Sequence, residues 1–390
     1  MYSLGINFLN NLSFTRKFQV ILLTLLLPIL YASVVIYQEN SHKIDLIVNK
    51  IAGLESVNTL KPLRVLAAKH RGSSAQWFSG NKNIGSTINS LEDQMASAIQ
   101  QAKIGLNNDI YSELSRQSLD KLQQNWKGLL FQEIKSQPAK DSFKRHTDWI
   151  TQVGILINHI AIQSGLSLDL ELSAYELMNL SVFSLPKIQE SLGQLRGIGA
   201  GVATKGSFDA SSFVAASTLS NTIRNDMSMI ELEFDILSEL SSKFVPKEFQ
   251  QAKESIQKFQ QITKNKLLDP DSPTISGNDY FSMGTDTIVQ VTNLHKALNT
   301  TYQETLEKDK AAMTSSMIFS LGTFAILFLI ACYLFMCLRI TVAQNVGMTQ
   351  RMAADLEAGT LNQEYYSKSK DELGRTINAL KNSYSELRSV

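Results

Sequence analysis

Cysteine is almost absent from this chain. Two cysteines occur in 390 residues, Cys332 and Cys337, and both lie in an apolar run toward the C-terminal end. The long polar middle of the chain therefore has no thiol, which excludes a disulfide there and leaves packing alone to stabilise it. Proline and glycine are also sparse, at 7 and 20 residues, whereas helix-forming side chains are plentiful. This composition predicts an almost all-α fold.

An excess of charge is lacking as well. The chain carries 37 basic and 36 acidic side chains, a net charge of +1, and no basic stripe, so we expect no nucleic-acid partner. Motifs such as His-Glu-x-x-His, Gly-x-Ser-x-Gly, Cys-x-x-Cys and a phosphate-binding glycine loop with lysine are missing. The five histidines are scattered rather than spaced as metal ligands. We predict a protein that is not an enzyme and has no catalytic residue, cofactor or metal site.

Two long apolar runs are present, Phe18 to Tyr37 and Met317 to Leu338. Each can cross a hydrocarbon core of roughly 30 Å. The first run is longer than the apolar part of a signal peptide and lacks a small-residue cleavage site, so we interpret it as a retained anchor. Arg16 and Lys17 precede it and Glu39 follows it, which favours a cytoplasmic N-terminus.

These runs predict the domain organisation of a membrane receptor. If both cross the membrane, the two chain ends lie on one side and the polar middle lies on the other. The expected parts are a cytoplasmic N-terminus (1–17), a first span (18–37), an extracytoplasmic sensor domain (38–312), a second span (313–338) and a cytoplasmic region (339–390).

Turn-forming residues divide the middle segment into helices. They lie at Gly80, 105–109, Pro138, Leu185-Pro186, 206–209, Pro246 and 269–273. Between them, apolar residues recur at steps of three and four, which gives each helix one buried face. The segment is too long for one four-helix bundle, so we predict two stacked helical bundles whose end helices continue into the spans.

The region after Arg339 has a pattern of its own. Asn345 to Ala358 is amphipathic, Gly359 to Leu361 ends that helix, and Asp371 to Gly374 opens a second one with Asp371 as its N-cap. The second helix carries an apolar seam suited to a parallel coiled coil, formed by Leu373, Ile377, Leu380, Tyr384 and Leu387.

This region resembles the HAMP signalling module. Asp371-Glu372-Leu373-Gly374 matches the module's best-known motif and Ala358 to Leu361 matches its connector start, whereas positions 343–345 lack the proline that such modules usually carry. The resemblance implies a homodimeric relay that acts on a cytoplasmic partner or on an output domain beyond Val390. A juxtamembrane coiled coil without a signalling role is the alternative.

Two arginines stand out in the predicted sensor domain. Arg71 flanks the apolar face of its helix, next to His70. Arg196 lies beside a ridge of three glycines spaced four apart, Gly193, Gly197 and Gly201. Each glycine costs roughly 1 kcal/mol of helix propensity relative to alanine, so the ridge indicates that another helix or subunit approaches closely.

A guanidinium at such an interface needs an acceptor. A carboxylate is one possibility, with Glu190, Asp226, Glu231 and Asp235 as candidates. A small planar anion is the other, because a guanidinium fork fits a planar oxyanion. The residues alone leave both interpretations open.

The sensor segment also resembles the nitrate- and nitrite-sensing (NIT) helical domain over most of residues 40–312. His70 to Ala75 is similar to its Arg-Gly signature, and Leu185 to Gly197 is similar to a later proline-containing helix with a second Arg-Gly. Residues 279–285 resemble a segment found before the second span in chemoreceptors. The resemblance implies a ligand site formed by Arg71, Arg196, Arg224 and His70.

Together these patterns predict a homodimeric, multi-pass receptor of the methyl-accepting chemotaxis type in a bacterial inner membrane. Its periplasmic domain would sense a small anion such as nitrate or nitrite, and its HAMP module would relay the signal. The front end of a sensor kinase or diguanylate cyclase has the same layout. A ligand-free structural membrane protein with long coiled helices is an alternative of a different class.

Overall fold

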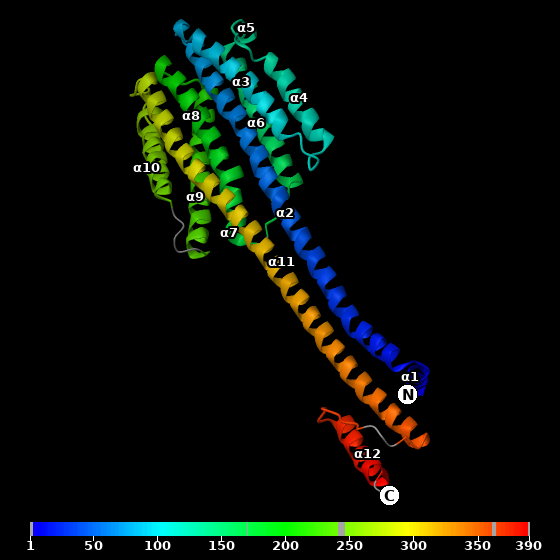
Figure 1. Cartoon of the computed structure of the whole chain (residues 1–390). Coiled ribbons are helices and arrows are strands. Elements are labelled where there is room, and N and C mark those ends of the chain that lie inside the picture. The colour runs from blue at the N-terminus through cyan, green and yellow to red at the C-terminus, as the bar shows by residue number, and fades with distance from the viewer. Residues whose placement is uncertain (1–2, 170, 241–245, 361–363, 389–390) are drawn as a thin grey trace. The chain divides into compact units, whose positions relative to one another are not determined.

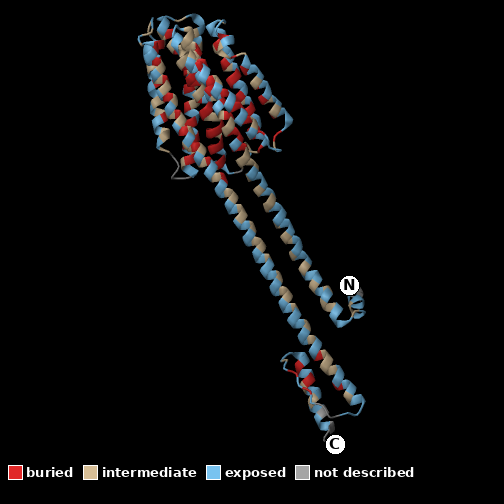
Figure 2. Ribbon diagram, turned by 45° about the horizontal axis from the view of Figure 1, so that its top comes forward, coloured by how far each residue is buried: buried red, intermediate tan, exposed pale blue. Residues whose placement is uncertain are grey.

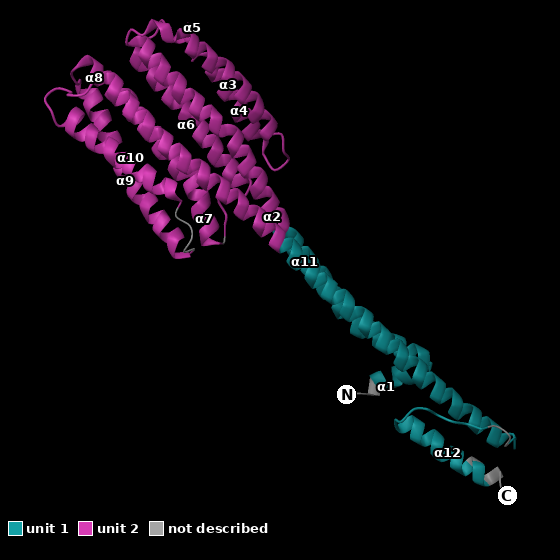
Figure 3. Cartoon of the chain, turned by 60° about the vertical axis from the view of Figure 1, so that its left-hand side comes forward, with its two compact units in different colours: residues 1–43, 313–390 teal, residues 44–312 magenta. Residues whose placement is uncertain are grey.

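The computed structural model describes residues 3–169, 171–240, 246–360 and 364–388. Every regular element among these residues is a helix (Figure 1), which confirms the all-α prediction. The chain divides into two compact units (Figure 3): one comprises Met1–Lys43 and Met313–Val390, and the other comprises Ile44–Ala312. The second unit covers most of the predicted sensor segment.

The first half of the chain contains α1 (Ser3–Asn10), α2 (Phe14–Phe78), a short 3-10 turn η1 (Lys82–Ile84), α3 (Gly85–Gly105), α4 (Glu113–Lys127), α5 (Phe131–Ile134) and α6 (Ala139–Gln163). The second half contains α7 (Leu172–Met178), α8 (Leu185–Lys205), α9 (Ala210–Leu240), α10 (Lys247–Ile262), α11 (Gly277–Glu357) and α12 (Glu372–Arg388). Two π-helical turns, η2 (Asn179–Ser184) and η3 (Thr263–Leu268), connect α7 to α8 and extend α10.

The Ile44–Ala312 unit contains two groups of helices side by side. In Figures 1 and 3, α3, α4 and α6 lie on one side of α2, and α8, α9 and α10 lie on the other with α11. A single apolar core runs through both groups, from Leu63 of α2 through Val153 of α6 to Leu192 of α8 and Leu298 of α11. Figure 2 shows the buried residues gathered here. The two groups of helices therefore share one core.

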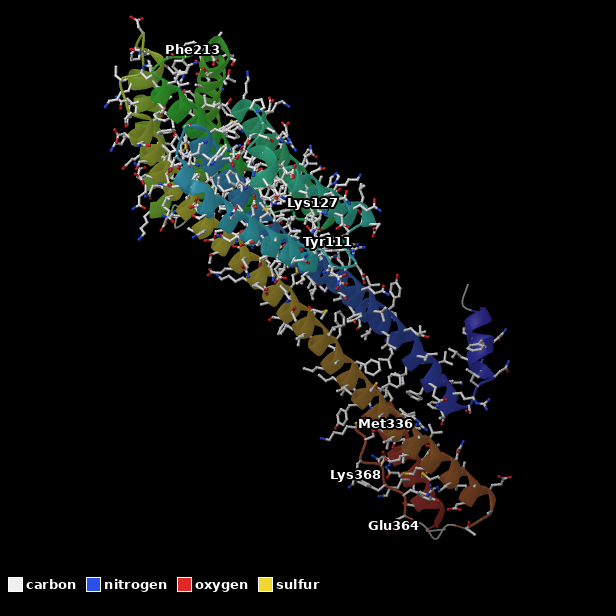
Figure 4. The ribbon with its side chains drawn as sticks, turned by 90° about the horizontal axis from the view of Figure 1, so that it is seen from above. Tyr111, Lys127, Phe213, Met336, Glu364 and Lys368 are labelled. Atoms are coloured by element: carbon white, nitrogen blue, oxygen red, sulfur yellow. The ribbon has the colours of Figure 1, made fainter. Side chains whose placement is uncertain are left out.

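Local contacts fix the connections onto this core. Tyr111, labelled in Figure 4, lies between α3 and α4, and its hydroxyl donates to Ser56 Oγ of α2 at 2.8 Å. Gly80 and Gly206 have positive φ at the ends of α2 and α8, a conformation that glycine adopts without a Cβ clash. Pro138 and Pro246 directly precede α6 and α10. These predicted breaks are confirmed.

The predicted break at Leu185-Pro186 is wrong. The chain is helical from Leu172 to Lys205, and a π-helical turn precedes the proline. Proline has no N–H to donate and its ring crowds the preceding turn, so a widened turn before it lets the helix continue. A break that the sequence pattern did not reveal lies instead at Gly165, where φ is +74°.

The predicted spans lie in the uninterrupted helices α2 and α11, each of which contributes residues to both units. Both helices are long and apolar enough to cross a membrane, with a mean hydropathy of 2.5 in their most apolar stretch. Those stretches are almost entirely unburied; Leu23, for example, is 61% exposed and Phe319 is 78% exposed. Within the unit formed by Met1–Lys43 and Met313–Val390, the rings of Phe18 and Phe335 meet edge to face, with centroids 5.6 Å apart.

The C-terminal helix begins as predicted. Gly359 has φ +71° just after α11, and the segment that carries Glu364 and Lys368 (Figure 4) leads to α12. Asp371 Oδ1 accepts the Gly374 N–H at 2.8 Å, and this bond lowers the pKa of the Asp371 carboxyl. Asp371 is thus the N-cap of α12.

Close packing holds α12 in its unit at two places, Gly374 and Ile377. A Cβ at Gly374 would clash with the Ser369 carbonyl, so the glycine of the motif is required sterically. Ile377 packs with Met352 and Tyr365 in a small core. The side chains of the seam residues Tyr384 and Leu387 lie outside the described residues. The HAMP assignment itself stays a prediction.

Candidate functional site

Arg71 lies where α2 packs against α6 and α8, and its side chain is only 2% exposed. Nη1 donates to Glu190 Oε1 of α8 at 2.6 Å and to Thr147 Oγ1 of α6 at 2.8 Å, and Nη2 donates to Glu190 Oε2 at 3.3 Å. The guanidinium carbon lies 4.9 Å from the centroid of the Phe143 ring. Arg71 therefore has a two-pronged ion pair with one of the four carboxylates expected as acceptors.

Arg196 lies on α8 and is held by neutral groups of α11. Nη1 donates to Thr285 Oγ1 at 2.9 Å, and the guanidinium carbon lies 4.4 Å from the centroid of the Phe281 ring. Nε of Arg196 is buried and has no hydrogen-bond partner among the described residues. A buried donor without an acceptor costs free energy, so an acceptor atom placed here would be stabilised.

The surroundings of the two arginines repeat one pattern. A Phe-x-x-x-Thr sequence, Phe143 to Thr147 on α6 and Phe281 to Thr285 on α11, supplies a ring face and a hydroxyl to each guanidinium. Each threonine also donates to the carbonyl of its own phenylalanine, at 3.0 and 2.8 Å. Residues four apart lie on one helix face, which explains the spacing. We call each arginine with its Phe-x-x-x-Thr partner a cradle.

Glycines of α2 and α8 lie where the two cradles meet. A Cβ at Gly72, next to Arg71 on α2, would lie 3.7 Å from Arg196 Nη2. Conversely, a Cβ at Gly193 of α8 would lie 3.4 Å from Arg71 Nη2. Each guanidinium thus extends over a glycine of the opposite helix, where an added Cβ would meet it at or near ordinary van der Waals distance.

The glycine ridge of α8 is used only in part. A Cβ at Gly197 would lie 3.0 Å from the Phe143 ring, whereas Gly201 faces open space. The prediction of close approach by another helix is therefore confirmed at Gly193 and Gly197. At Gly201 the described residues supply no neighbour.

Positive charge exceeds negative charge at this place. Burial and, to a smaller extent, the charge of Arg71 lower the pKa of the Arg196 guanidinium to about 10, while Glu190 opposes the shift. Arg64, two turns before Arg71 on α2, also interacts with the Glu190 charge, and burial lowers its pKa. Several guanidiniums therefore share one carboxylate, and the potential between them favours an anion.

The other two predicted ligand residues lie elsewhere. His70 is fully buried, and its ring contacts His146 of α6 and Glu92 of α3 rather than the arginines. Arg224 is exposed on α9, whose buried face carries Ile223 and Met227. The structure therefore brings together Arg71 and Arg196 and places Arg224 on a solvent-facing surface.

Sequence reasoning missed the residues of α6 and α11 that complete the site. The Phe-x-x-x-Thr spacing offers a stacking face and an acceptor one turn apart, but it was a weak signal, because it also occurs at Phe259 to Thr263 and at Phe319 to Thr323. Recognising it would have required knowing that α6 faces α2 and that α11 faces α8. Those contacts span 76 and 89 residues of sequence.

Comparisons with known proteins support the fold alone. No protein-family model and no curated protein matches the chain. Among solved structures, it is similar to the NasR transcription antiterminator, with 12% sequence identity and a TM-score of 0.53, over 91% of this chain and 95% of that chain. The similarity concerns the helical arrangement over nearly the full length of both chains.

Proposed function

We propose that this protein is a transmembrane receptor that binds a small planar anion between Arg71 and Arg196. The observation that carries the proposal is the pair of neighbouring cradles, of which only that of Arg71 holds a carboxylate, while Nε of Arg196 is buried without a partner among the described residues. A guanidinium offers parallel N–H donors that match the oxygens of a planar oxyanion. Nitrate and nitrite, which the resemblance to NIT domains implies, have this geometry.

Glu190 occupies the Arg71 fork. Its two carboxylate oxygens accept from Nη1 and Nη2 of Arg71, and Gln194 Nε2 donates to one of them at 2.8 Å. An incoming anion would compete with this carboxylate for Arg71 and would gain the free donor of Arg196. Competition from the Glu190 carboxylate therefore lowers the affinity of the site for the anion.

The site connects the helices that carry the apolar spans. Arg71 belongs to α2, and Arg196 of α8 is bonded to Thr285 of α11. An anion that closes the two guanidiniums together would shift α2 against α11, and both helices continue into apolar segments. A ligand changes an equilibrium only through different affinities for two states. The proposal therefore requires that the spacing of α2 and α8 differ between signalling states.

The direct test is thermal unfolding of the full-length chain in lipid nanodiscs with nitrate, nitrite, chloride and sulfate. An anion at 100 times its dissociation constant should stabilise the protein by about 2.7 kcal/mol. Arg71→Ala and Arg196→Ala should abolish the stabilisation. The control is Lys69→Ala, which removes an exposed positive charge from α2 and should leave the stabilisation unchanged. Equal stabilisation of wild type and both arginine variants would refute this site.

A ligand-free structural role is the second candidate, favoured by one observation. The two-pronged bond between Arg71 and Glu190 already satisfies that arginine internally. This alternative predicts no stabilisation by any anion in the series, in wild type or in the variants. The output class, whether chemoreceptor, sensor kinase or diguanylate cyclase, is a separate question, because all three share this front end.

A further inference from the structure

Two fully buried histidines meet beside the arginine site. His70 directly precedes Arg71 on α2, and His146 directly precedes Thr147 on α6. Both side chains are 0% exposed, and His70 Nδ1 lies 2.7 Å from His146 Nε2. The second arginine has no such pair beside it: the positions before Arg196 and Thr285 are Leu195 and Gly284. A cradle therefore packs without histidines, and the pair calls for a separate explanation.

The histidines form the middle of a row of four groups. His146 Nδ1 lies 2.7 Å from the Ser142 carbonyl oxygen, and His70 Nε2 lies 3.3 Å from Glu92 Oε1. The same Glu92 oxygen accepts the backbone N–H of Phe131. The Ser142 carbonyl oxygen at one end of the row can only accept a hydrogen bond. Glu92 Oε1 at the other end can also only accept while the carboxylate is ionised.

Counting hydrogen atoms along this row gives a result that does not depend on tautomers. The row contains three contacts, and each needs one hydrogen atom. Two neutral imidazoles supply one N–H each. A third proton is therefore bound between Ser142 and Glu92, on a ring or on the carboxyl. Without it, two lone pairs would oppose each other inside the protein, at the cost of a buried unmade hydrogen bond.

The surrounding charges place the third proton at the Glu92 end of the row. Burial lowers the pKa of His146 to about 3, and His70, Arg71 and Arg145 lower it as well, against the effect of the Ser142 carbonyl. His146 is therefore the neutral ring. The indole of Trp126 on α4 packs on both rings, with centroids 5.1 Å from His70 and 6.3 Å from His146.

We propose that buried His70 and half-buried Glu92 hold a proton that couples pH to anion binding at Arg71 and Arg196. The ionisable groups around it are Glu92 of α3, His146 and Arg145 of α6, and Arg71 of α2 itself, with Glu190 of α8 bonded to Arg71. A bound anion offsets positive charge beside His70 and favours the proton. By reciprocity, the proton favours the anion.

This inference rests on the proposed function and adds its regulation. Because the anion-bound state holds the proton more firmly, anion affinity should fall as pH rises. Loss of the proton should also weaken the contact between α2 and α3, since His70 and Glu92 would then face each other as two acceptors. The receptor would report anion and acidity together.

The proton itself is counted by ¹⁵N NMR of the imidazole nitrogens, with the full-length chain in nanodiscs at about pH 6, within the range where histidine changes charge. The two buried rings should carry three N–H groups in wild type. In Glu92→Gln they should carry two, because the amide itself donates to His70 Nε2. His159→Gln, which removes an exposed histidine of α6, should leave the count at three. If the third proton lies on the carboxyl, the rings carry two N–H groups and the ¹³C shift of Glu92 is that of a protonated carboxyl. Two N–H groups beside an ionised Glu92 carboxylate would overturn the proposal without any variant.

The coupling is measured by calorimetry with nitrate, whose charge is constant between about pH 5 and pH 8, where histidine titrates. Wild type and His159→Gln should bind nitrate about tenfold more tightly at the acid end, with proton uptake on binding. Glu92→Gln should bind nitrate with an affinity that does not change with pH. An unchanged pH dependence in Glu92→Gln would overturn the coupling. Absence of nitrate binding at every pH would overturn both the coupling and the anion site, while the NMR count would still stand on its own.

Discussion

The two cradles make the same contacts and differ in charge. Arg71 and Arg196 each stack on a phenylalanine and donate to a threonine one turn further on. Only Arg71 holds a carboxylate in a two-pronged bond, and only Arg196 has an unpaired buried nitrogen. Because both arginines make these two contacts, we infer that a phenylalanine ring and a threonine hydroxyl suffice to position a guanidinium between helices. The difference teaches that the second guanidinium can take an acceptor that the described residues do not supply.

The largest expected contrast is in folding stability. Arg71→Met removes one partner of a buried ion pair and leaves Glu190 uncompensated, which should cost about 3 kcal/mol. Arg196→Met removes a desolvated cation whose Nε is unsatisfied, so its cost should stay below about 1 kcal/mol. Denaturant unfolding of the full-length chain checks both. Equal losses would show that the two arginines are held alike, and adding Glu190→Leu to Arg71→Met should restore most of the loss.

The next contrast tests whether the hydroxyls are equivalent. Thr147→Val and Thr285→Val keep the side-chain shape and remove one hydrogen bond to a guanidinium each. Both should destabilise the protein by about 1.5 kcal/mol, the lower range for a bond to a charged group. Thermal unfolding measures the difference between them. A loss confined to one threonine would contradict the likeness of the cradles.

The smallest expected effect concerns Glu233, a buried carboxyl of α9 in the group formed by α8, α9 and α10. Burial raises the pKa of Glu233 to about 7, although Ser184 and Asn179 donate to it. The folded state therefore binds a proton between about pH 4.5 and 7 that the unfolded state releases, and this contribution to stability is lost as pH rises through that range. Glu233→Gln should flatten that decline and raise stability above pH 7 by roughly 1 kcal/mol.

The pH series of wild type and Glu233→Gln, followed by thermal unfolding, checks this sign. Two parallel stability curves between about pH 4.5 and 7 would show that Glu233 is already ionised in the folded protein. The His70 row lies in the other helix group and should respond independently, because distant sites without shared partners contribute additively.

The sequence predicted some of these features well, for identifiable reasons. Apolar runs, helix periodicity and the Asp371 N-cap depend on residues close together in the chain, so the all-α fold and the start of α12 could be predicted. Arg71 could be placed at a helix interface, and Glu190 was one of four candidate partners. Pro186 was misjudged because a π-helical turn absorbed its missing hydrogen bond.

The contacts that define the site could not be predicted in the same way. His70 meets His146 across 76 residues, and Arg196 meets Thr285 across 89. Such pairings follow from which helix faces which, and helix periodicity alone leaves that order open. Arg224 illustrates the limit: the resemblance added it to the site although no glycine follows it as in the two Arg-Gly segments, and its helix α9 turns that residue toward solvent.

The most direct test of the central claim is a calorimetric titration of nitrate into full-length wild type and Glu190→Gln at one pH. The substitution removes the competing charge from the Arg71 fork while keeping an acceptor of the same shape. If the two guanidiniums form the anion site, nitrate should bind Glu190→Gln about tenfold more tightly, a gain of about 1.4 kcal/mol. Unchanged or weaker binding in that variant would contradict the claim that an anion competes with Glu190 for this pair of arginines.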